Sequence, residues 1–460
     1  MLLITKMKVL TKTKEYEMKR IYHVSNRVFL LLELLILVTL LMISCKKTQQ
    51  AGSSRQASGG GSLSGTITFS TWGAPNEKEV NEVIIAAFEK KNPGTKVNLE
   101  YIPADYITKI DTMFLGGNAP DVIYGHPHYF TAWADQGLIA DLSDRFEADR
   151  AFYSDPKFAQ NMYGSFQYKG RSVATINGHD TFLLYYNKNL FDEAGISYPD
   201  DRWTWDTFLE AAIKLSDDRP GMERRYAIIF PDYPPSLFWI IYSFGGNIFD
   251  SMDYPTKVVF NSPETVEALR FVQDAIWKYK IAPSYTTPIE GISFDSGKVA
   301  MDVNGSWMPA GRRYITDFKW DMANLPMRAG KPRRTSAYFA GYCVNKASKN
   351  PDLAYAFAKF FQEDEGQTIL SGLGLITVIN QQIASDPEIL NGPGFPEHHA
   401  LRVSSISYAT NGYANIRNWQ EMIEKVLQPY IDDLYANNIS PEECARRIHT
   451  DLDRLLAESR

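Results

Sequence analysis

Strand and helix patterns alternate along the chain from residue 66 onward, and this alternation limits the possible folds more than any other feature of the sequence. Apolar and β-branched runs predict strands over residues 66–71, 96–101 and 121–124. Apolar residues at helical spacing predict a helix in each of the two intervals between these strands. Elements in this order indicate a parallel sheet with right-handed crossovers, so the sequence predicts an α/β protein.

The same alternation continues toward the C-terminus. Asn76 and Glu79 are expected to form a capping pair at the start of the first helix. Further strands are predicted over residues 183–186, 299–303 and 340–344. Further helices are expected over 205–215 behind Thr204, from Pro351 behind Asn350, and over 417–456 with a break near 437–441.

The N-terminal segment has the pattern of an export signal. Residues 28–43 (VFLLLELLILVTLLMI) form a short apolar run, and Lys19, Arg20 and Arg27 precede it. The run is too short for a confident membrane span, and it contains Glu33, which a permanent span tolerates poorly. We therefore expect this segment to direct export and not to belong to the fold.

A cysteine follows the apolar run directly. The sequence Met42-Ile43-Ser44-Cys45 resembles a bacterial lipobox, in which the signal is cut before a cysteine that carries diacylglycerol. This resemblance implies a signal peptide over residues 1–44 and lipidation at Cys45, with the protein held at the outer face of the cell membrane. Residues 45–65 are rich in Gly, Ser and Gln and are expected to form a flexible tether. The alternative is a signal anchor that is never cleaved.

The charge and the cysteines exclude several other classes of protein. The chain has 48 Lys and Arg against 54 Asp and Glu, a formal net charge of −6. This balance argues against a general nucleic-acid-binding protein, which needs a cationic face. Cys343 and Cys444 are expected to be two buried thiols and not a disulfide. No zinc-ribbon spacing is present, and the sequence indicates no cofactor.

Several segments together resemble the bacterial extracellular solute-binding proteins, the family that includes maltose-binding protein. The most telling pair is YNKNLFDEAGI followed by WTWDTF. The likeness covers nearly all of the mature chain and keeps its order. The matching segments are ITFSTWG (67–73), AFEKKNPGTKVNLEYIP (87–103), GGNAPDVIYG (116–125), WADQGLIADLSD (133–144), LLYYNKNLFDEAGISYP (183–199), WTWDTFLEAAIKL (203–215), GKVAMDVNGSW (297–307) and SKNPDLAYAFAKFF (348–361).

The resemblance implies a two-lobed periplasmic-binding-protein-like (type II) fold. Each lobe would be a mainly parallel sheet flanked by helices, with the solute held in the cleft between lobes. Because the chain of such proteins crosses between lobes more than once, both lobes are expected to be discontinuous. The first would hold residues 66–178 plus 336–384, and the second residues 179–335 plus 385–460.

Flat aromatic side chains after predicted strands are the first candidates for this cleft, because a sugar ring offers apolar faces on which they stack. Trp307 is the strongest candidate, since it follows a strand and a glycine and resembles the family's stacking tryptophan in GSW. The other aromatic candidates are Trp72, Tyr129 and Trp239. For each of the four, the alternative is an ordinary core aromatic residue.

Polar candidates come from three loops. Asp180 lies in Asn177-Gly178-His179-Asp180, where family members often carry a hydroxyl-binding residue, although a turn or cap aspartate is the alternative. His128 lies near the position of a sugar-contacting acid in the family and is expected to donate to a hydroxyl or oxyanion. Tyr413 and Arg417 precede the last long helix, where the family often supplies cleft contacts, and Arg417 is equally compatible with an ordinary surface position.

The histidines give little support for a metal site. His126 and His128 lie two residues apart, but no third ligand falls at a telling spacing, so we expect no metal there. The pair His398-His399 is expected at the surface. Asp121 is expected to brace the start of its strand and not to touch a ligand.

Two classes of function remain. The resemblance implies a non-catalytic, monomeric substrate-binding lipoprotein of an ABC importer, which captures a carbohydrate and delivers it to the permease subunits in the membrane. The alternative is an exported glycan-acting hydrolase that uses a carboxylate pair. The sequence lacks the GxSxG, HExxH and P-loop patterns, but a carboxylate pair has no sequence signature that would exclude it.

Overall fold

The computed structural model describes residues 63–217, 224–284 and 287–459. The predicted signal peptide, Cys45 and nearly all of the predicted tether lie outside these residues. Within the described part of the chain, no helix has both the length and the apolar character needed to cross a membrane.

The first predicted elements form as expected. Strand β1 (Gly65–Thr71) pairs in parallel with β2 (Thr95–Tyr101) and with β3 (Val122–Gly125). Helices α2 (Pro75–Lys91) and α3 (Tyr106–Gly116) provide the crossovers. The α/β prediction is confirmed. Asp121 braces the start of β3, because its Oδ2 accepts hydrogen bonds from the backbone N–H and the hydroxyl of Thr68, at 2.8 and 3.0 Å.

The predicted cap of α2 is wrong by two residues. Ala74 is the N-cap, and the Glu77 carboxylate accepts a hydrogen bond from its backbone N–H at 3.2 Å. Pro75 starts the helix earlier than Asn76 because its fixed φ suits the first helical position and its missing N–H costs nothing there. As a result, the Glu77 carboxylate lies beside Gly73, just after the end of β1.

Two long strands cross the molecule. β6 (Thr175–Asn187) and β9 (Thr335–Val344) pair antiparallel with each other, and β9 also pairs antiparallel with β3. The far half of β6 pairs antiparallel with β7 (Met301–Gly305) and β8 (Trp320–Ala323). The sheet is therefore mixed. The short strands are β10 (Thr377–Val378) beside β6, β11 (Ala409–Asn411) parallel to β9, and the hairpin β4 (Gln167–Tyr168) and β5 (Arg171–Ser172).

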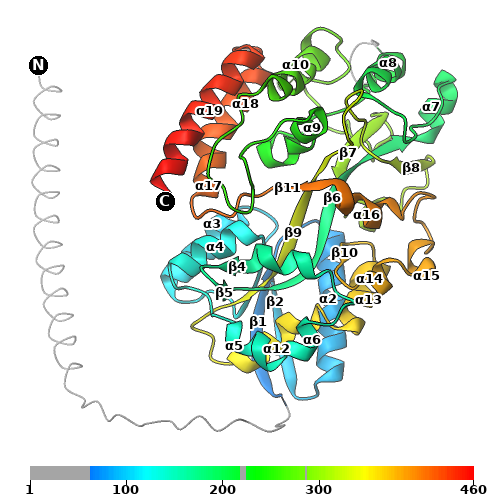
Figure 1. The fold of residues 1–460 in the computed structure, drawn as a ribbon. Helices are drawn as coiled ribbons and strands as arrows, with labels where there is room; N and C mark the ends of the chain where they lie inside the picture. Colours follow the sequence, from blue (N-terminus) through cyan, green and yellow to red (C-terminus); the bar gives the residue numbers. More distant parts are fainter. Residues whose placement is uncertain (1–62, 218–223, 285–286, 460) are drawn as a thin grey trace, which may run out of the picture. The chain divides into compact units, whose positions relative to one another are not determined.

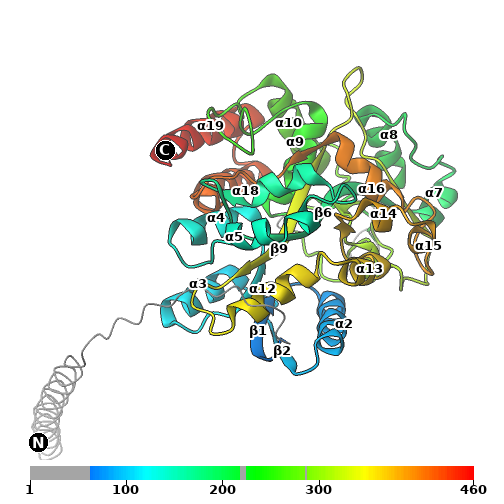
Figure 2. The ribbon, with the colours of Figure 1, turned by 60° about the horizontal axis from the view of Figure 1, so that its bottom comes forward.

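Helices cover the sheet at both ends. In Figures 1 and 2, α10, α18 and α19 lie together at one end of this part of the molecule, and α2 and α12 lie at the other. The other α-helices are α4 (Pro127–Asp135), α5 (Ser143–Ala148), α6 (Arg150–Tyr153), α7 (Lys188–Ala194), α8 (Trp205–Leu215), α9 (Phe238–Phe244), α10 (Pro263–Trp277), α11 (Pro309–Arg312), α12 (Pro351–Phe360), α13 (Asp364–Gly372), α14 (Gln381–Ala384), α15 (Pro387–Leu390), α16 (Leu401–Ser404), α17 (Trp419–Met422), α18 (Gln428–Tyr435) and α19 (Pro441–Glu458).

Short non-α turns complete the chain. The 3₁₀ helices are η1 (Gln160–Phe166), η3 (Pro234–Leu237) and η4 (Ser405–Tyr408), and a π-helical turn, η5 (Ile423–Leu427), joins α17 to α18. The predicted helix over 205–215 is confirmed, with Thr204 as its cap, and so is the broken C-terminal helix. Asn350 is the N-cap residue of α12, although its side chain makes no capping hydrogen bond.

The apolar core is divided. The largest cluster of buried residues draws on positions between 182 and 325, on Tyr338, and on positions between 413 and 456. Two further clusters draw on positions between 67 and 176 and between 340 and 384. The boundaries given above for the two lobes remain a prediction. Cys343 and Cys444 are buried free thiols, as expected.

Candidate functional site

A cavity of about 190 Å³ lies where the core clusters meet. On one side the cavity is lined by Trp72, at the end of β1, and by Glu77 of α2. On the other side it is lined by Phe182 of β6 and by Trp307, in the turn after β7. The middle of β9 adds Tyr338 and further residues. The aromatic residues of the lining are Trp72, Tyr124, His126, Phe182, Trp307, Tyr338, Tyr342 and Tyr413.

The Trp307 ring is held in one orientation. A Cβ at Gly305 would lie 1.8 Å from Cζ3 of Trp307, so the ring packs directly against the glycine. The Phe182 ring meets it edge to face at 5.6 Å. The ring of Trp72 is packed in the same way against Tyr124 and Tyr106, at 4.5 and 4.8 Å. Both tryptophans remain partly exposed, which leaves apolar surface for a ligand.

The polar lining includes two carboxyl groups among its hydroxyl and amide groups. Asp180 lies on β6, and its Oδ1 accepts a hydrogen bond from the Ser306 hydroxyl at 2.7 Å. The Asn177 amide N–H donates to the Tyr342 hydroxyl at 3.0 Å, and its carbonyl oxygen has no partner among the described residues. Glu77 supplies a second carboxylate. Burial raises the pKa of Glu77, and it raises that of Asp180 to about 7.

The charge of a buried cation acts on Asp180. Arg402 is 3% exposed, and its charge opposes the rise in the pKa of Asp180. Its Nη1 lies 3.0 Å from Nε2 of His399. The surface prediction is therefore wrong for His399, which is 1% exposed and stacks on Phe395. The side chain of His398 is 52% exposed, as expected.

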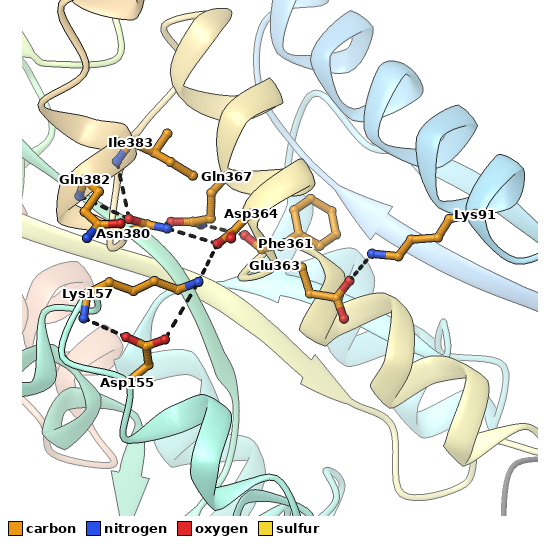
Figure 3. A network of polar contacts seen from close by, with 10 residues as sticks. All are labelled: Lys91, Asp155, Lys157, Phe361, Glu363, Asp364, Gln367, Asn380, Gln382 and Ile383. Carbon is orange, nitrogen blue, oxygen red and sulfur yellow. Dashed lines mark hydrogen bonds and ion pairs between the residues drawn. The ribbon is translucent and has the colours of Figure 1, made fainter.

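Polar contacts from α13 hold the part of β6 that contains Asn177. The amide of Gln367, which is fully buried, donates to the backbone carbonyl of Asn177 at 2.9 Å, and its carbonyl accepts from the backbone N–H of Asn380 at 3.0 Å. Figure 3 shows this network continuing through Asp364 to Lys157, at 2.8 Å. The segment 177–180, expected as a loop, is part of β6, because it pairs with β9 and β10.

The pKa of Asp180 predicts a specific pH dependence. Between its ordinary value of 3.8 and about 7, the folded state holds a proton that the unfolded state has lost, so this group's contribution to stability falls as pH rises. Asp180→Asn cannot ionise and lacks this loss. We expect the unfolding free energy of the variant, relative to the wild type, to rise by up to about 1.4 kcal/mol per pH unit over that range.

Urea unfolding of both proteins at several pH values between about 4 and about 7 measures this difference. Subtracting the wild type removes the contributions of His126, His179 and His399, which burial affects in both proteins alike. A difference that does not change with pH would contradict the assignment of a protonated Asp180.

The structure brings half of the predicted site residues together. Trp72, Asp180, Trp307 and Tyr413 all line the cavity. Tyr129 lies in an adjoining groove of about 650 Å³, which shares Trp72, His126 and Tyr413 with the cavity. The cleft therefore continues outward past these three shared side chains.

The other predicted residues lie elsewhere. Trp239 is fully buried in the core and stacks between Trp205 and Phe230, so it does not reach the cavity. Arg417 is at the surface, where it pairs with Asp135 at 3.8 Å. Neither residue lines the cavity or the groove.

His128 is also placed differently from its prediction. It is 2% exposed in the first turn of α4, wedged between Tyr129 and Tyr413 at 3.8 and 4.2 Å. Neither ring nitrogen has a partner among the described residues. In the described part of the chain, the one group of three side chains with metal-ligand spacing is Asp321, Glu397 and His398, away from this cavity.

Several cavity residues were not predicted. Glu77 was missed because the helix start was placed too late, and Tyr124 because it reads as an ordinary strand residue. Tyr338 and Tyr342 lie on a long strand whose first half carries no clear strand pattern. The one available signal was the pair of tyrosines four residues apart, since residues at even spacing along a strand share a face.

Comparison with known proteins identifies the family. Residues 73–368 match the profile of the bacterial extracellular solute-binding proteins. The chain is 27% identical over 330 residues to the maltotriose-binding protein of Pyrococcus abyssi, which spans 69% of this chain and 67% of that protein.

Two solved structures are similar to this one. An ABC substrate-binding protein of Listeria monocytogenes in complex with cycloalternan matches with a TM-score of 0.76 and 26% identity, over 85% of this chain and 99% of that one. A maltose-bound protein of T. maritima matches with a TM-score of 0.71 and 23% identity over the same shares of the two chains.

The chain therefore belongs to the bacterial extracellular solute-binding protein family, in its maltose-binding-like branch. Its fold is the two-lobed type II fold of that family, and the family resemblance inferred from the sequence is confirmed. Members of this family act outside the cytoplasm, and they are in general binding proteins and not enzymes.

Proposed function

We propose that this protein captures a carbohydrate in the cavity and delivers it unaltered to the permease subunits of an ABC importer. The observation that carries the proposal is the pairing of Trp72 and Trp307 with two carboxylates in a single cavity. Tryptophan faces suit the apolar faces of sugar rings, and carboxylates accept hydroxyl protons. The relatives named for maltotriose and cycloalternan support a saccharide over other solutes.

The delivery step requires two states of the protein. A ligand that contacts both walls of the cavity would favour a closed arrangement of the lobes, because it gains contacts there that an open arrangement cannot offer. The permease would then recognise the closed form. We propose that the protein acts as a monomer in this cycle.

Ligand capture is tested by thermal shift across a panel of mono- and oligosaccharides. A ligand at one hundred times its Kd adds about 2.7 kcal/mol to the unfolding free energy, which is readily seen as a higher Tm. We expect at least one saccharide to give this response. No response from any saccharide would contradict the proposal.

A glycan-acting hydrolase is the second candidate, because Glu77 and Asp180 are two carboxyl groups with raised pKa values in one cavity. Prolonged incubation with the saccharide that binds, followed by an assay for new reducing ends, separates the two functions. We expect unaltered saccharide, and accumulation of new reducing ends in proportion to enzyme concentration would favour the hydrolase.

Gly305→Ala should weaken saccharide binding without touching the saccharide. The added methyl group displaces the Trp307 ring, so we expect affinity to fall by up to about 2–4 kcal/mol, as for loss of a central aromatic anchor. Calorimetry measures the change. Gly311→Ala is the matched control, since its methyl group would meet nothing nearer than 3.6 Å. Equal affinities of the two variants would contradict this positioning of Trp307.

We further propose that Cys45 carries the lipid anchor and that residues 45–65 tether the binding domain to the membrane. Cys45→Ser removes the thiol that accepts diacylglycerol, so we expect labelled fatty acid to be absent from the variant and the protein to appear in the soluble fraction. Incorporation of label into the variant would contradict the anchor assignment.

A further inference from the structure

In the described part of the chain, acidic side chains line the cleft without a matching set of basic ones. The cavity is lined by Glu77 and Asp180, and the adjoining groove by Asp105, Asp111 and Glu424. No Lys or Arg lines either space among the described residues. A neutral saccharide can donate its hydroxyl protons to these carboxylates but gains nothing from their negative charge, whereas a cationic ligand gains from both.

These five acids are not equally compensated. Asp180 has Arg402 behind it, and Asp111 accepts a hydrogen bond from the Trp133 indole N–H at 2.8 Å. Glu77 has no cation within 4.0 Å among the described residues, and one backbone N–H is its hydrogen-bond donor. Glu77 is therefore the carboxylate in the cavity that most lacks a positive partner.

One neutral polar group of the cavity also lacks a hydrogen-bond donor among the described residues. The carbonyl oxygen of Asn177 is without a partner, although this residue is only 2% exposed. A buried acceptor left unpaired is unfavourable, so a ligand that donates to it gains binding free energy. An ammonium group offers three donors in the place where a hydroxyl offers one.

The aromatic lining suits the same ligand. Trp72, Tyr124 and Trp307 line the cavity, and a cation over such a ring is attracted to its electron-rich face. Aromatic rings and carboxylates both line the cavity, so a ligand with sugar rings and positive charge can contact both kinds of side chain. A purely acidic saccharide would meet repulsion throughout.

We propose that the cleft selects saccharides that carry free amino groups, that is, cationic amino sugars, over neutral and acidic ones. This inference rests on the proposed carbohydrate-binding function and narrows it to a class of ligand. Glu77 is the specificity-determining residue, and the acids of the groove favour oligomers in which more than one ring carries an amine.

The test uses three disaccharides with the same β-1,4 linkage: the dimers of glucosamine, of N-acetylglucosamine and of glucose. They differ at the second carbon alone, where the substituent is an ammonium, an acetamide or a hydroxyl group. Calorimetry on the mature protein near neutral pH and low salt should give the glucosamine dimer an affinity at least ten times that of either other dimer. The α-linked glucosamine and glucose dimers repeat the comparison for the other linkage.

Glu77→Gln removes the charge and keeps the shape. We expect the ratio of affinities between the glucosamine and glucose dimers to fall by at least threefold. Glu79→Gln, an exposed position on the same helix, removes the same charge and should leave the ratio unchanged. An equal fall in both variants would point to overall charge and overturn the role of Glu77.

The outcomes separate this inference from the function on which it rests. Neutral dimers that bind as well as the amine, or no amine binding while other saccharides bind, overturn the amino-sugar inference and leave the carbohydrate-binding proposal standing. If no saccharide of any kind binds, both are wrong.

Discussion

Replacement of Trp307 by alanine is expected to lower saccharide affinity by about 2–4 kcal/mol, a loss of about 30- to 1,000-fold, as is typical of a central aromatic anchor. The ring is partly exposed in the cavity and is held between Gly305 and Phe182, so it offers a fixed face at no further entropic cost. Calorimetry with the best saccharide of the panel measures the loss.

The same variant should remain folded. Trp307 packs at the edge of the largest apolar cluster and is not one of its buried members, so its removal should cost much less stability than binding. Trp307→Phe keeps a smaller flat ring and is expected to retain part of the affinity. A folded Trp307→Ala protein with unchanged affinity would show that the ligand does not rest on this ring.

Trp239→Ala is expected to behave in the opposite way. Its side chain is fully buried between Trp205 and Phe230, so truncation leaves a large void, and we expect a loss of about 3–5 kcal/mol of unfolding free energy. Denaturant unfolding measures this loss. Any protein that remains folded should bind the saccharide nearly as the wild type does, because the ring is not part of the cavity.

Trp239→Phe supplies the control. It keeps most of the apolar volume and removes an indole N–H that has no partner among the described residues, so the cost should be well below that of alanine. A Trp239→Ala protein with unchanged stability and much weaker binding would reverse the assignments of the two tryptophans.

This contrast indicates what the sequence can predict. Both tryptophans were candidate cleft residues, since local pattern does not say which side of a strand or helix faces a ligand. Trp307 was favoured because it follows a strand and a glycine, and it lines the cavity. Trp239 belongs to α9, in which every residue is buried, so that no polar face marks its orientation.

The fold was largely predictable because its signals are local. The first three strands and the helices between them follow from apolar periodicity and turn residues. β6 was predicted over 183–186 but runs over Thr175–Asn187. Its first half is polar, and it is a strand because it pairs with β9 and β10, which come from far along the chain. Ser306, Gln367 and Tyr342 bond to some of its polar groups. Local sequence patterns do not indicate such distant partners.

The candidate site was predictable only in part for the same reason. Asp180 and Tyr413 were predicted because the family resemblance indicated their segments. Glu77 was not predicted, because its helix starts two residues earlier than expected. His128 was predicted to contact the ligand from a loop, but it lies in α4 and is buried against Tyr413, which is far away in sequence. Contacts between distant segments thus decide which polar residues face the ligand.

A crystal structure of the mature protein grown with its best saccharide tests the central claim most directly. We expect the saccharide to lie between Trp72 and Trp307, with a sugar ring stacked on Trp307 and a hydrogen bond to the Asp180 carboxyl group. A saccharide bound outside this cavity, or in contact with one wall alone, would contradict the claim that the two sides together capture the ligand.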